Sequence, residues 1–170
     1  MNFAELCKAR YSLRRFSDRP VEQEKLDLIL EAAHNAPTAV NFQPQRIFVL
    51  RSPEALAKVP QCSECRWQVP VALLVAYDPK VAWVRDNDGM NHGDMDAALA
   101  AGQMMLQAAE LGLGTTFVGM LDIEAIHKCF PETEGLVPIC VMPLGYPAEN
   151  ARPARLHDAK QPLEDMVTYL

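Results

Sequence analysis

Apolar residues recur along this chain with two spacings, and each spacing predicts one kind of element. Five stretches carry them at every third or fourth position, which predicts helices over residues 2–10, 21–35, 52–59, 94–111 and 122–130. Four runs rich in β-branched and aliphatic residues predict strands over residues 46–51, 69–78, 115–121 and 136–147. Asn2 followed by Glu5 predicts a capping box at the first helix, and Gly112 is a typical stop for the fourth.

Two of these elements are too apolar to face water. The strand VPVALLVAYD has no alternation, so both of its faces are expected to be covered in the middle of a sheet. The helix over 94–111 has almost no charge after Asp96, so the sheet, another helix or a second subunit must cover most of it. The sequence therefore predicts an α+β fold with a central sheet flanked by helices.

The composition limits the possible partners. A chain of 170 residues without repeats or a linker is expected to form one domain, residues 1–170. Its formal net charge of -6 argues against nucleic acid or an anionic membrane surface as the main partner. No apolar run is long enough to span a membrane, five cysteines follow no disulfide framework, and the first residues lack a signal-peptide layout. We therefore expect a cytoplasmic location.

Positive charge is concentrated near the N-terminus, in the segment KARYSLRRFSDRPV at residues 8–21. One interpretation is a solvated helix end, where cations meet the C-terminal dipole favourably. The other rests on spacing, because Arg10, Ser12 and Arg14 alternate and would point the same way from an extended segment. Such a group can clamp a phosphate and meet a planar anionic ring, so a pocket for a small anion is expected.

The segment APTAVNFQP, residues 36–44, also allows two interpretations. It is either a polar loop between a helix and a strand or a set of neutral hydrogen-bonding groups that reads the edge of a heterocycle. Thr38, Asn41 and Gln43 carry the groups for the second interpretation.

Other motifs give little support to other chemistries. There is no Walker loop, and GLGTTFVG leads into a strand rather than a helix, unlike a dinucleotide-binding loop. No nucleophile elbow is present. Cys62 and Cys65 have the spacing of half a zinc site or of a thiol redox pair, but no second pair of ligands matches them, so no metal site is predicted.

The order of these motifs resembles the nitroreductase-like flavoproteins. ARYSLRRF is similar to their R-x-S-x-R-x-F segment, and APTAVNFQP to their A-P-S-x-x-N-x-Q-P segment. The likeness continues through DMDAALAAGQMMLQAAELGLGTTFVG, PLGYP and KQPLEDMV, and so covers most of the chain in the same order. The resemblance implies the nitroreductase fold, with a mixed, mostly antiparallel sheet, in a homodimer that holds FMN in two sites between its subunits.

The resemblance also implies roles for particular residues. Arg10 and Ser12 would hold the phosphate and ribityl chain of FMN, with Lys160 from the tail at the phosphate and Arg14 near the N1/O2 edge of the ring. The cofactor-binding residues implied in this way are Arg10, Tyr11, Ser12, Arg14, Thr38, Asn41, Gln43, Val118, Gly119 and Lys160. Thr38, Asn41 and Gln43 would come from the other subunit, and the backbone of Val118 and Gly119 would meet N5 of the flavin.

Two positions depart from the family's pattern, since Gln45 replaces an aromatic residue and Asp158 replaces a basic one. The acceptor side is expected to involve Phe42, Trp67 and Trp83, the last in the segment 79–93. That segment is either a substrate lid or a surface loop with a partly buried tryptophan.

The activity implied is oxidation of NADH or NADPH and reduction of planar, electron-poor acceptors such as nitroaromatics or quinones, in two half-reactions at one place. Because FMN carries the chemistry, no catalytic acid or base is expected among the side chains. Two alternatives stay open: a flavin-binding or flavin-consuming protein without reductase turnover, and a metal or thiol redox module at Cys62 and Cys65.

Overall fold

The computed structural model describes residues 1–170. One four-stranded antiparallel sheet with the order β1-β2-β4-β3 lies at its centre. Its strands are β1 (Gln45–Leu50), β2 (Val71–Tyr77), β3 (Gly114–Thr115) and β4 (Val137–Gly145). The one parallel pairing is an isolated bridge between Ser12 and Thr115. The prediction of an α+β fold with a central, mostly antiparallel sheet is confirmed.

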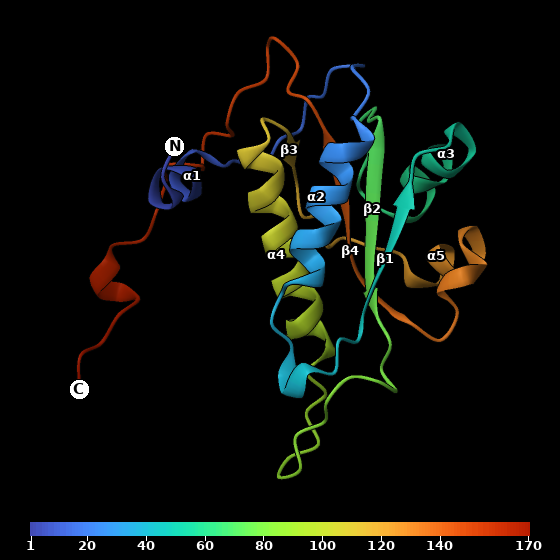
Figure 1. Cartoon of the computed structure of the whole chain (residues 1–170), viewed down its shortest axis with the longest axis vertical. Coiled ribbons are helices and arrows are strands. Elements are labelled where there is room, and N and C mark those ends of the chain that lie inside the picture. Colours follow the sequence, from blue (N-terminus) through green and yellow to red (C-terminus); the bar gives the residue numbers. More distant parts are fainter.

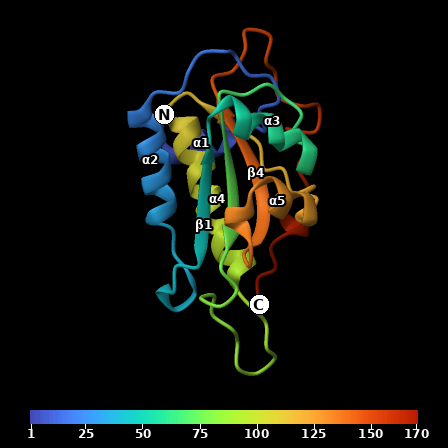
Figure 2. The same cartoon turned by 90° about the vertical axis from the view of Figure 1, so that its right-hand side faces the viewer.

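Helices cover both faces of this sheet (Figures 1 and 2). The five α-helices are α1 (Phe3–Ala9), α2 (Gln23–His34), α3 (Pro53–Cys62), α4 (Gly93–Glu110) and α5 (Ile123–Cys129). Short 3-10 turns lie at Ala39–Asn41, Pro131–Thr133 and Leu163–Asp165. The pair α2 and α4 packs on one face, and the pair α3 and α5 on the other. None of the helices is long and apolar enough to pass through a bilayer.

The core consists of two apolar layers separated by the sheet. Every residue of β2 is buried, as its unbroken apolar run predicts. Val71, Leu73 and Val75 face α2 and α4, whereas Ala72 and Leu74 face α3 and α5. Because successive side chains of a strand point to opposite faces, an apolar strand covered on both faces joins the two layers into one structure.

The prediction of a strand over residues 115–121 is wrong in its bounds, because β3 ends at Thr115. The register of β3 on β4 would place Thr116 opposite Pro143, which has no N–H to donate to the ladder. Pairing resumes in the same register at Val118, which exchanges both backbone hydrogen bonds with Val141 at 3.0 Å. A proline in β4 therefore interrupts the strand.

Three parts of the chain extend beyond the layers. Helix α1 and the C-terminal segment lie to one side of α4, and the hairpin between β2 and α4 projects from one end (Figure 1). One side of α4 is also uncovered: Met95 and Leu99 are exposed, while Ala100 and Met104 are buried. The expectation of a helix covered on most sides is therefore met by this chain on one side only.

Candidate functional site

A cavity of about 270 Å³ lies between the arginine segment and the C-terminal tail. Eight residues line it: Arg10, Tyr11, Ser12, Arg14, Ala154, Leu156, His157 and Lys160. Three of them carry fixed positive charges and none is a carboxylate, although the chain as a whole is acidic. Such a concentration of cations favours an anionic ligand.

The backbone of the arginine segment is extended and fastened at its middle. Leu13 is buried, its N–H donates to the carbonyl of Thr115 at 2.9 Å, and its carbonyl accepts from the hydroxyl of Thr116 at 2.5 Å. Since side chains alternate along extended backbone, burying Leu13 directs Ser12 and Arg14 away from the core. The structure thus brings together in one cavity the alternating residues that the sequence singles out.

Arg10 gives the clearest indication of the ligand. Its Nη1 atom is buried and has no hydrogen-bond partner in the chain. A buried, unpaired guanidinium nitrogen is costly, and a phosphate is a suitable partner because it accepts the fork of donors with two oxygens. Ser12 adds a hydroxyl and Lys160 an ammonium group to the same cavity. These residues fit the phosphate of FMN.

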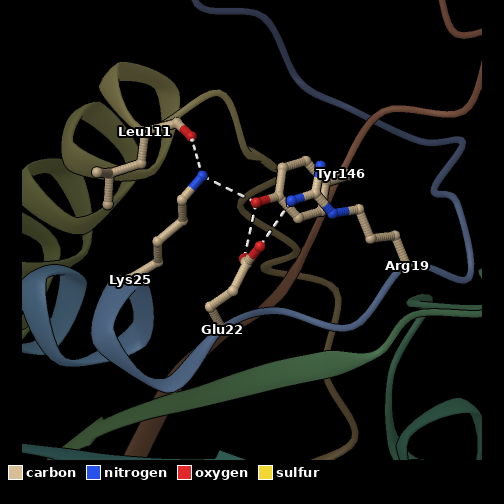
Figure 3. A network of polar contacts seen from close by, with 5 residues as sticks. All are labelled: Arg19, Glu22, Lys25, Leu111 and Tyr146. Atoms are coloured by element: carbon tan, nitrogen blue, oxygen red, sulfur yellow. Dashed lines mark hydrogen bonds and ion pairs between the residues drawn. The ribbon is translucent and has the colours of Figure 1, made fainter.

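A network of polar contacts fixes the end of the arginine segment (Figure 3). Tyr146, just after β4, donates its hydroxyl to Glu22 at 2.7 Å and accepts from Lys25 at 2.8 Å. Lys25 also donates to the carbonyl of Leu111 at 2.9 Å, and the Arg19 guanidinium lies 3.9 Å from the centre of the tyrosine ring. The hydrogen bond from Tyr146, then a backbone hydrogen bond, then the bond from Arg19 lower the pKa of Glu22 from its ordinary 4.5 to about 2.

The tail is attached to the same point as the arginine segment. Ser17 donates its N–H to the carbonyl of Tyr146, and Ala148 donates to the carbonyl of Arg15 at 3.0 Å. The end of the arginine segment and the start of the tail are therefore paired by backbone hydrogen bonds.

Sequence reasoning missed one candidate hydrogen-bonding side chain in this cavity. His157 lines it, its side chain is mostly buried, and its ring meets that of Tyr11 edge-on at 6.2 Å. Its neighbour Asp158 is almost fully exposed and does not line the cavity. The resemblance leads one to expect a basic residue at position 158, and His157 lies directly before it. That neighbourhood was the signal in the sequence that could have identified His157.

The loop of residues 38–43 lies far from this cavity in the same chain. The arginine segment lines a second cavity together with the C-terminal end of α4, whereas Ala39 is hydrogen-bonded to Asp96 near the beginning of that helix. Fourteen residues of helix separate Asp96 from Glu110, which corresponds to about 20 Å. One chain thus does not bring Thr38, Asn41 and Gln43 to the cavity, and a site containing both segments needs a second copy.

Val118 and Gly119 differ in the availability of their backbone N–H groups. The N–H of Val118 already donates to Val141 in the sheet. Gly119 is exposed and its N–H has no backbone partner. Of the two residues, Gly119 is therefore the one with a free donor.

The aromatic residues expected near an acceptor lie in three separate places. Phe42 is exposed on the 38–43 loop. Trp67 lines a cavity with α3 on the far face of the sheet. Trp83 packs on His92 at 4.7 Å between ring centres, within the projecting hairpin. The chain alone does not gather them into one wall.

Cys62 and Cys65 lie in the apolar layer under α3 and α5. Both are buried, and burial raises the pKa of each thiol to about 11. Thiols with so high a pKa are protonated at neutral pH and are poor nucleophiles and metal ligands. No group of three or more histidine, cysteine or acidic side chains is arranged to hold a metal ion. This geometry does not favour the metal or thiol module.

Comparison with known proteins points in one direction. The family model described as "Nitroreductase family" matches residues 7–69 and 63–146. The crystal structure of a nitroreductase family protein from Clostridium difficile 630 has 37% sequence identity and a TM-score of 0.91, and the match covers 99% of this chain and 98% of that one.

Two curated relatives carry more specific names. A protein of Methanothermobacter thermautotrophicus with the provisional name "NADH dehydrogenase/NAD(P)H nitroreductase" is 34% identical over 93% of this chain and 84% of its own. The "FMN reductase (NAD(P)H)" of Bacillus subtilis is 27% identical over 94% of this chain and 71% of its own.

Proposed function

The chain belongs to the nitroreductase family, and from this premise we propose that it is an FMN-dependent NAD(P)H oxidoreductase that reduces planar, electron-poor acceptors such as nitroaromatics and quinones. The observation that carries the proposal is the cationic cavity with the unpartnered, buried Nη1 of Arg10. The names of the relatives support FMN as cofactor and NAD(P)H as electron donor.

In this proposal the cavity binds the phosphate end of FMN. Arg10 and Lys160 neutralise the phosphate, and the Ser12 hydroxyl adds a hydrogen bond there or at the ribityl chain. Tyr11 contributes the backbone between them. Arg14 places a fixed positive charge on the ring side of the cavity, where it favours negative charge and therefore a higher reduction potential.

The ring end of the site is completed by a second subunit. Thr38, Asn41 and Gln43 of one copy supply neutral hydrogen-bonding groups, and the free N–H of Gly119 supplies a donor. We expect a homodimer of single-domain chains, each spanning residues 1–170. The uncovered side of α4, with Met95 and Leu99, is the apolar surface available for this contact.

The chemistry that FMN would supply at this site is hydride acceptance from NADH or NADPH and electron transfer to an acceptor that takes the same place. The chain's contribution is to hold, orient and shield, and no side chain has to move a proton. Phe42, Trp67 and Trp83 are the aromatic residues assigned to the acceptor side. The proposed location is the cytoplasm, where both nicotinamide cofactors are available.

The test is steady-state oxidation of NADH and NADPH by the FMN-loaded protein, with a quinone or a nitroaromatic as acceptor. Turnover that depends on both FMN and the acceptor supports the reductase. A protein that binds FMN but oxidises neither nucleotide would instead be a flavin-binding protein without turnover, and the proposal would be wrong.

A further inference from the structure

The 38–43 loop has an unusual backbone. Val40, Asn41 and Gln43 have φ values of 53°, 57° and 53°, in the left-handed region that glycine normally occupies. Asparagine tolerates this region, but a β-branched valine is a true outlier there. Val40 is also mostly exposed, so burial of its side chain does not compensate for the strain. Residues held in this way persist only where the surroundings impose the conformation.

Besides the backbone bonds of its 3-10 turn and one from the Gln43 side chain, three hydrogen bonds hold the loop in this conformation. Within the loop, Gln43 donates its N–H to the hydroxyl of Thr38 at 3.1 Å, and Arg46 donates to the carbonyl of Gln43 at 3.2 Å. The third is the bond to α4, in which Ala39 donates its N–H to Oδ1 of Asp96 at 2.8 Å. It joins residues 57 positions apart and fixes the start of the loop, immediately before the strained residues.

Asp96 itself is in a costly position. Its side chain is buried, it lies beside the buried residues Ala97 and Ala100, and its Oδ2 has no hydrogen-bond partner. An acidic residue in the first turn of a helix interacts favourably with the helix dipole, but the exposed Asp94 already provides this interaction in the same turn. A half-satisfied buried carboxylate is therefore not explained by the stability of the helix.

We propose that Asp96 is a positioning residue, which holds the 38–43 loop in the strained conformation in which Thr38, Asn41 and Gln43 meet the flavin bound to the partner subunit. The inference rests on the proposed function for its last step, because the loop's ligand is the flavin. The anchoring of the loop by Asp96 stands on the hydrogen bond alone. Asp96 touches neither cofactor nor substrate, and it acts through Ala39.

Two substitutions separate positioning from stability. Asp96→Leu keeps the approximate shape, suits the apolar surroundings and removes the acceptor for Ala39. Asp96→Asn keeps an oxygen that accepts the same N–H. Asp94→Asn is the matched control, since it removes a charge from the same helical turn at an exposed position.

The experiment measures the FMN dissociation constant of the flavin-free protein by titration, the melting temperature, and hydrogen exchange of the loop. For Asp96→Leu we expect an unchanged or higher melting temperature, faster exchange at residues 38–43, and FMN binding weakened about tenfold or more, as for the loss of a charged hydrogen bond. Asp96→Asn and Asp94→Asn should bind FMN as the unmodified protein does.

Wild-type FMN affinity in Asp96→Leu would overturn the proposal, and so would an Asp96→Asn protein as weak as Asp96→Leu. If Asp96→Leu does not fold, exchange of the Ala39 amide in the unmodified protein decides: slow exchange supports the anchor, and exchange as fast as in an open loop refutes it. An unmodified protein that takes up no FMN would refute the proposed function, and the Ala39 exchange rate would still test the anchor.

Discussion

Replacing Arg10 by alanine separates the contribution of the phosphate from that of the ring in flavin binding. The buried Nη1 of Arg10 has no partner within the chain, so in our account its main role is to donate to a ligand anion. A hydrogen bond to a charged group contributes about 1.5–3 kcal/mol. Since 1.4 kcal/mol corresponds to a factor of ten, Arg10→Ala should raise the dissociation constant of FMN about ten- to a hundredfold.

The assay is a titration of flavin-free protein with FMN and, in parallel, with riboflavin, which has the same ring but no phosphate. Arg10→Ala should weaken FMN binding and leave riboflavin binding unchanged. Arg15→Ala is the control, because Arg15 is an exposed neighbour that does not line the cavity. Stability should not fall, since removing one of three clustered cations relieves repulsion.

Equal losses for FMN and riboflavin would refute the reasoning, because they would mean that Arg10 supports the ring or the fold rather than the phosphate. Unchanged FMN binding would place the phosphate elsewhere.

Three further predictions follow from the network and from the open side of α4. Because the folded pKa of Glu22 is about 2, below its ordinary 4.5, its ionisation stabilises the fold fully above a pH of about 4.5. This contribution is lost as the pH falls towards 2. Denaturant titrations across this range should show that the free energy of unfolding declines less for Glu22→Gln than for the unmodified protein. Tyr146→Phe removes the hydroxyl that joins Glu22 to Lys25 and should cost about 0.5–1.5 kcal/mol in urea unfolding, whereas Tyr169→Phe, at an exposed position, should cost nothing measurable. Leu99→Asp, on the uncovered side of α4, should give a monomer that retains no flavin, as measured by light scattering with absorbance detection. Leu28→Asp, at an exposed position of α2, is the matched control. A flavin-loaded Leu99→Asp monomer would contradict the shared site.

Features set by neighbouring residues could be predicted from the sequence. The capping box of Asn2 and Glu5 is present as expected, since its two hydrogen bonds join residues three apart. The buried central strand followed from its unbroken apolar run, and the common cavity of Arg10, Ser12 and Arg14 from their alternation.

Features that depend on distant residues could not be predicted in this way. The interruption of β3 depends on which residue of β4 lies opposite Thr116, and that register is set by the folded sheet. The bond between Ala39 and Asp96 joins the 38–43 loop to the first turn of α4 across 57 positions, so no local pattern reveals it. His157 belongs to no motif beyond its place next to Asp158, and it lines the cavity only because the tail lies beside the arginine segment in the folded chain.

The visible spectrum of the purified protein, before and after anaerobic addition of NADH or NADPH, tests the central claim most directly. The account predicts a flavin absorption band that is lost with one of the two nucleotides and returns when a quinone or nitroaromatic is added. A colourless protein that also takes up no added FMN would contradict the account, because the cavity around Arg10 would then have no flavin phosphate to bind.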